Sequence, residues 1–149
     1  MPDGTPMRPP SSCRANRSAM ARWMSALADW PALEKHVAEM SESRVGVIAH
    51  KGWLGEIAAR RGKIEEARAT IQWLRAQDPK QQFGYAEFME ARILAVLGEK
   101  AAAVERLRDA MARWVVRFEL FSPRLTRVDR AFDSLRDDPE FKKLIAPQD

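Results

Sequence analysis

Apolar residues recur at three- and four-residue steps along most of the chain, and short polar turns interrupt them at regular intervals. The clearest stripe follows Gly62 and consists of Ile64, Ala67, Ile71 and Leu74. Such steps place side chains on one face of an α-helix. Because few runs favour strands, the pattern predicts an all-α fold in which each stripe faces a shared core.

The predicted helices end at turns that specific residues mark. Gly62 ends a first helix, because glycine readily takes the left-handed conformation found just past a helix C-terminus. The next helix opens after Lys63, with acidic residues near its positive end. Pro79 stops it, because proline disfavours the helical state of the residue before it. Within the first helix, Gly55 is expected to let a neighbouring helix approach closely.

This helix–turn–helix unit returns on both sides. Gly98 lies 36 residues after Gly62, and Ala103 follows Gly98 at the spacing by which Ala67 follows Gly62. Towards the N-terminus, Ala28 occupies the turn position 34 residues before Gly62. One helical pair cannot bury its apolar face alone, so about three stacked units are needed for stability.

The central unit resembles the tetratricopeptide repeat (TPR) family at Leu54, Gly55, Ala67 and Pro79. Large aromatic positions of that pattern hold other residues here, namely Lys51, Ala58 and Ile71. The resemblance implies a right-handed α-α superhelix, a TPR-like solenoid, with units at about residues 17–47, 48–83 and 84–117 and a cap at 118–146.

The end of the chain is the second informative stretch. Asp138 can cap a short last helix, and Pro139 suits the first position of that helix. Phe132 and Leu135 are expected to plug the open end of the stack, while Phe141 faces inward. This ending is similar to the close of bacterial TPR arrays, which often form the C-terminal parts of signalling proteins. An in-cis regulatory segment of a kinase, nucleotide cyclase or transcription regulator is therefore an alternative function.

Composition and charge narrow the function classes. The 149 residues fit one domain, and most of the net charge of +4 lies in the first 22 residues, where there are four arginines and one aspartate. The remainder is nearly neutral, which argues against a nucleic-acid partner. Residues 1–16 are expected to be a disordered tail. No secretory signal and no run of about 18 apolar residues occurs, so we expect a cytoplasmic protein without a membrane span.

Residues that carry most enzyme and metal chemistry are few. Cys13 is the one cysteine, and His36 and His50 are the only histidines. No metal-ligand spacing, phosphate loop or nucleophile elbow occurs. We expect no metal, no cofactor and no catalytic residue, and a small all-helical enzyme is kept as an alternative from another class.

Two further groups of residues have structural interpretations. The five tryptophans are interpreted as packing residues rather than a ligand cage. A basic stripe of Arg124, Arg127 and Arg130 is interpreted as a solvated helix face balanced by Asp129 and Asp133. Binding of duplex DNA by this stripe is the less favoured interpretation.

The resemblance to TPR stacks also implies where a partner would bind, because the first helix of each pair lines a concave groove in that family. The usual groove positions correspond here to Arg22, Ser25, Gly52, Glu56, Ala59, Arg60, Tyr85, Phe88, Met89 and Arg92. Carboxylate-gripping TPR grooves have Lys and Asn where this chain has Gly52 and Glu56, so a chaperone tail is not expected.

The predicted function is a non-catalytic scaffold that binds a peptide or helix of a partner protein in this groove. The expected partner contacts are Arg22, Glu56, Arg60, Tyr85, Phe88 and Arg92. Packing of Phe88 and Met89 in the core between helices is an equal alternative. Association with a second copy of the chain is left open.

Overall fold

The computed structural model describes residues 17–26, 28–39, 44–78, 80, 84–113 and 123–147, and every regular element among them is a helix. The described elements are α2 (Arg17–Ala26), α3 (Trp30–Ala38), α4 (Arg44–Arg60), α5 (Ile64–Arg75), α7 (Tyr85–Val96), α8 (Lys100–Ala112), α9 (Pro123–Val128), the 3₁₀ helix η2 (Arg130–Leu135) and α10 (Pro139–Leu144). The all-α expectation is confirmed. The tail with Cys13 and the helix stop at Pro79 lie outside the described residues.

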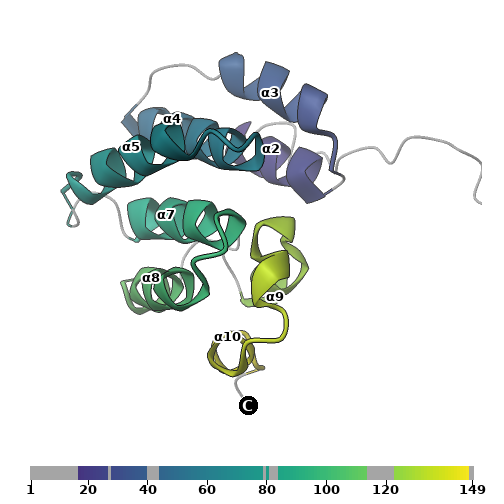
Figure 1. Cartoon of the computed structure of the whole chain (residues 1–149), viewed down its shortest axis with the longest axis vertical. Helices are drawn as coiled ribbons and strands as arrows, with labels where there is room; N and C mark the ends of the chain where they lie inside the picture. Colours follow the sequence, from purple (N-terminus) through teal and green to yellow (C-terminus); the bar gives the residue numbers. More distant parts are fainter. Residues whose placement is uncertain are drawn as a thin grey trace, which may run out of the picture.

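Consecutive helices pack in pairs, α2 on α3, α4 on α5 and α7 on α8 (Figure 1). Helix α7 lies at the centre of the molecule, because it contacts α4, α5, α8 and η2. Every residue from Ala86 to Ala95 is consequently buried. None of the helices in the described ranges is both long and apolar enough to cross a bilayer.

The predicted turns lie where the sequence placed them. Helix α4 ends just before the Gly62 turn, and Gly62 and Gly98 have φ angles of +74° and +82°. Ala103, which follows the Gly98 turn, is fully buried as expected. Ile64 is an exception, because its side chain is 41% exposed and does not continue the buried stripe of α5.

The close approach predicted at Gly55 is confirmed. A Cβ atom there would lie 2.6 Å from Thr70 Cγ2 of α5 and 2.7 Å from Ile93 Cδ1 of α7. Gly52, one turn earlier, would meet the Met89 side chain in the same way, at 2.6 Å from Cε. Glycines on α4 therefore let this helix lie directly against two neighbours.

The first turn holds the one described non-glycine residue with a positive φ, Ala28 at +55°. A left-handed backbone brings the Cβ of an L-residue close to the carbonyl oxygen. The turn persists because the amides of Ala28 and Asp29 donate back to α2, at 3.0 and 3.1 Å. Asp29 also caps α3 by accepting from the Ala32 amide at 3.2 Å.

Replacing Ala28 with glycine is expected to raise the free energy of unfolding by about 0.5–1 kcal/mol, because glycine relieves the left-handed strain but adds freedom to the unfolded chain. Urea denaturation followed by circular dichroism measures the change. The control is Ala69→Gly at an exposed position within α5, which should lower stability by about 0.5–1 kcal/mol. A loss of stability from both substitutions would contradict the strain at Ala28.

The C-terminal segment comprises α9, η2 and α10, and its last helix, α10, begins at the residues that the sequence predicted. The Asp138 carboxylate accepts from the amides of Glu140 and Phe141 at 2.9 and 3.0 Å, and Pro139 takes the first turn of α10. Three apolar side chains of this segment are fully buried, Phe132, Leu135 and Phe141.

This segment packs against more than the last helical pair, α7 and α8. Phe132 lies between Phe88 of α7 and Phe141, with ring centroids 5.8 Å from each. Helix η2 contacts α7 and α8, and it also reaches α2, the first described helix. The C-terminal segment therefore contacts both the first and the last of the described helical pairs, which the sequence did not indicate.

Candidate partner-binding site

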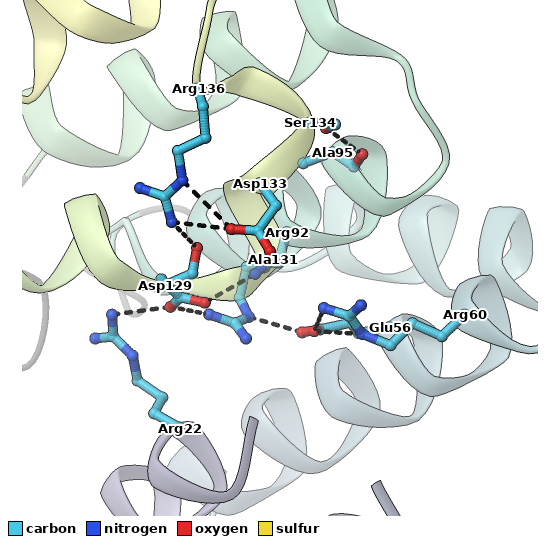
Figure 2. A network of polar contacts seen from close by, with 10 residues as sticks. All are labelled: Arg22, Glu56, Arg60, Arg92, Ala95, Asp129, Ala131, Asp133, Ser134 and Arg136. Carbon is cyan, nitrogen blue, oxygen red and sulfur yellow. Dashed lines mark hydrogen bonds and ion pairs between the residues drawn. The ribbon is translucent and has the colours of Figure 1, made fainter. Parts of the chain in front are cut away.

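Charged side chains from distant parts of the chain meet where α2, α4 and α7 face the C-terminal segment (Figure 2). We call this group the charge network. Its members are Arg22 of α2, Glu56 and Arg60 of α4, Arg92 of α7, and Asp129 between α9 and η2. Four of the five are residues that the sequence predicted to contact a partner.

Arg92 is the centre of the charge network, and its side chain is fully buried. Its Nε donates to Glu56 Oε2 at 2.8 Å, and its Nη1 donates to Asp129 Oδ2. The guanidinium also lies over the buried Trp53 ring, 4.4 Å from the centroid. Burial opposes the charge of Arg92, but the two carboxylates outweigh burial and raise its pKa above the ordinary value.

Asp129 holds the C-terminal segment to the helices. Besides the hydrogen bond from Arg92, its Oδ2 accepts one from Arg22 Nη2 at 3.0 Å, and its Oδ1 accepts one from the Ala131 amide at 3.1 Å. Ser134 adds a hydrogen bond from Oγ to the Ala95 carbonyl of α7, at 2.7 Å. Helix η2 is thus fastened to α2 and α7 by polar contacts as well as by its apolar side chains.

The same contacts set the ionisation of Asp129. Burial alone would raise the pKa of this carboxyl, but the charges of Arg92 and Arg22, with the Ala131 amide, hold it below 3.8. Burial is also the main cause of the lowered pKa of Arg22, which Asp129 partly offsets. The lowered pKa keeps Asp129 ionised at neutral pH, so it meets the arginines as a carboxylate.

Stability is expected to fall on acidification below about pH 4, where an unfolded aspartate begins to take up its proton. The folded pKa of Asp129 is lowered, so its contribution is complete above the unfolded pKa and is lost as the pH falls through the folded value. Urea denaturation at a series of pH values measures this loss, and Asp129→Asn should make the curve flatter. The control is Asp133→Asn, because Asp133 is 58% exposed in its pair with Arg136. An equal effect of both substitutions would contradict the assignment to Asp129.

At its other end the charge network opens into a hollow beside Trp30. Glu56 Oε1 accepts from Arg60 Nε and Nη2 at 3.2 and 3.0 Å, and the Arg60 guanidinium lies over the Trp30 ring at 4.1 Å. The hollow has a volume of about 520 Å³. We call it the Trp30 hollow, and its lining residues are Trp30, Glu34, Ile57, Ala59, Arg60, Arg61 and Val96.

The predicted partner contacts differ in their access to solvent. Glu56, Phe88 and Arg92 are buried, at 0–1% exposure, and Met89 is buried beside them. The side chains of Arg22 and Arg60 are 14% and 24% exposed, and Tyr85 is half-buried. In this arrangement, only Arg22, Arg60 and Tyr85 of the six have surface to offer a partner.

The two aspartates predicted to balance the basic stripe also pair with arginines outside it. Asp129 belongs to the charge network, and Asp133 pairs with Arg136 at 3.1 Å. Arg127 instead donates from Nε to the Ile145 carbonyl at 2.6 Å, which ties α9 to the end of the chain.

Sequence reasoning missed Asp129 and most residues of the Trp30 hollow. Trp30 was interpreted as a packing residue, and Arg61 was given no role in binding. The one available signal was the adjacency of Arg60 and Arg61 at the end of a predicted helix, next to a groove position. Helical periodicity does not reveal that the start of α3, the end of α4 and Val96 of α7 border one hollow.

Comparison of the chain with protein-family models, with curated proteins and with solved structures found no match in any of the three. The functional conclusion therefore depends on the geometry of the charge network and of the Trp30 hollow.

Proposed function

We propose that the chain is a non-catalytic protein–protein interaction module. Its helical pairs would form a TPR-like solenoid, and a peptide or helix of the partner would bind on the side of α4 that carries Arg60. One observation supports this most. Residues predicted as partner contacts from three separate helices belong to one charge network, and this network opens into a hollow.

The C-terminal segment contacts one part of the charge network, and the Trp30 hollow borders another part. Asp129 and η2 cover Arg22 and Arg92, while Arg60 faces the hollow. A volume of about 520 Å³ lies within the range of about 300–1,000 Å³ that ligand-binding clefts span. Several side chains of a bound segment would fit there without displacing the C-terminal segment.

A selection from a displayed peptide library on the intact chain tests the proposal. The selected peptides should cross-link to a photoreactive residue at Arg61, at the mouth of the hollow, and not to one at Arg68. The two positions are matched, because Arg61 is 56% exposed and paired with Glu34, and Arg68 is 53% exposed and paired with Glu99. Failure to enrich any peptide, or equal cross-linking at both positions, would refute the proposal.

A further inference from the structure

The charged residues that line the Trp30 hollow are two arginines and one glutamate, Arg60, Arg61 and Glu34. The two carboxylates of the charge network, Glu56 and Asp129, are almost completely buried. Arg60 is the network member that lines the hollow, with 24% of its side chain exposed. At the mouth, Arg61 and Glu34 pair at 2.5 Å, so they cancel each other's charge. The hollow is therefore weakly positive, which favours an anionic ligand.

The Arg60 guanidinium is held in place before any ligand arrives. One face lies on the Trp30 ring, and two of its nitrogens, Nε and Nη2, donate to Glu56. Glu56 is itself fixed by Arg92. The third nitrogen, Nη1, has no partner among the residues that the structure describes. A carboxylate would meet this donor with little loss of side-chain entropy.

Arg61 offers a second guanidinium to the same ligand. Among the residues that the structure describes, its hydrogen-bond partner is Glu34, whose Oε2 accepts from Nη2. The pair is exposed, so water already solvates Arg61 and a ligand carboxylate can share the guanidinium with Glu34 at small cost.

The remaining wall of the hollow is apolar. It consists of Ile57, Ala59, Val96 and the ring of Trp30. A bare anion would leave this surface in contact with water, whereas an apolar side chain next to the anionic group would cover it. Charge and apolar surface together fit a short segment in which acidic and apolar residues alternate.

We infer that the Trp30 hollow binds an acidic peptide segment of the partner protein, with a glutamate or aspartate side chain against Arg60 and Arg61 and an apolar neighbour against Trp30 and Val96. This inference rests on the proposed function and names the class of its ligand. The anionic group is a side chain within the segment, so a free C-terminal carboxylate is not required.

The test uses the intact chain labelled with ¹⁵N and follows the indole N–H signal of Trp30, assigned with Trp30→Phe. The probe is a short peptide of alternating glutamate and leucine with both ends blocked, and its partner probe has glutamine in place of glutamate. We expect the acidic peptide to shift the Trp30 signal at low salt and the glutamine peptide to bind at least several-fold more weakly. The indole signal of Trp73 is the control and should not shift, because this ring lies on α5 under the Lys51 side chain.

Matched substitutions then locate the charge. Arg61→Gln should weaken binding of the acidic peptide about threefold to fivefold, the value of a partly exposed charge pair. Arg68→Gln removes an arginine of the same exposure on α5 and should leave the affinity unchanged. Added salt should weaken binding to the wild-type chain, because it screens exposed charges.

Three outcomes would overturn the inference. Equal binding of the acidic and glutamine peptides at Trp30 would show that affinity does not depend on the charge of the peptide, and the proposed function would stand. Equal effects of Arg61→Gln and Arg68→Gln would show non-specific attraction to the surface. Competition by inorganic phosphate at the concentration of the peptide would show a simple anion site. Failure of the proposed function itself would appear separately, as a library selection that enriches no peptide.

Discussion

Replacing Arg92 with methionine is expected to lower the free energy of unfolding by about 3–5 kcal/mol, because the buried carboxylates of Glu56 and Asp129 each lose a charged hydrogen-bond donor. Arg92 is fully buried and bridges Glu56 and Asp129. Methionine fills part of the space but neutralises neither carboxylate. Urea denaturation followed by circular dichroism measures the loss, and unfolding already in buffer would agree with it.

Two further variants make this prediction specific. Arg68→Met removes an arginine from an exposed pair and should cost less than about 1 kcal/mol. Adding Glu56→Gln to Arg92→Met should recover part of the lost stability, because it removes a buried carboxylate whose remaining ion pair, among the described residues, is with the partly exposed Arg60. If the second substitution instead adds its own full cost, the network does not act as a unit and Arg92 stabilises the fold by packing alone.

Replacing Phe132 with alanine is expected to cost about 3–5 kcal/mol, the usual range for a fully buried phenylalanine. The ring packs between Phe88 and Phe141, so its removal opens a cavity between the C-terminal segment and α7. The amides of η2 and α10 should then exchange with solvent faster than those of α4 and α5. Chemical denaturation and hydrogen exchange measure the two effects.

Val128→Ala is the control for this prediction. Val128 lies in the same segment but is 66% exposed, so the substitution should change stability by less than about 0.5 kcal/mol. Uniformly faster exchange over all helices in the Phe132→Ala chain would contradict the local effect. It would mean that the C-terminal segment and the helical pairs unfold as one unit.

The helices and their ends were predictable because the signals are local. Gly62 and Gly98 supply left-handed turns, and Asp138 with Pro139 starts α10. Even Ala28 was placed in a turn by its spacing from Gly62, although alanine carries no turn preference. Ile64 was misassigned to the core because periodicity shows which face of a helix a residue lies on, but not whether a neighbour covers that end of the helix.

The candidate site was predictable only in part. A family pattern placed Arg22, Glu56, Arg60 and Arg92 on one side of the helices, and the structure brings these four together. Asp129, which pairs with two of them, is 107 residues from Arg22 and 37 residues from Arg92. Because Asp129 lies beside other charged residues in the sequence, it was interpreted as part of a solvated helix face.

The sequence by itself determined the all-helical fold, the turns and the close approach at Gly55, because backbone conformation and side-chain size act over a few residues. Only the tertiary structure decided which charges are buried and what they pair with. Burial of Arg92 and Asp129 depends on η2 reaching across α7 to α2, and on the sum of many apolar contacts that position it. Ion pairing in such a site follows from the packing, so no local pattern of residues encodes it.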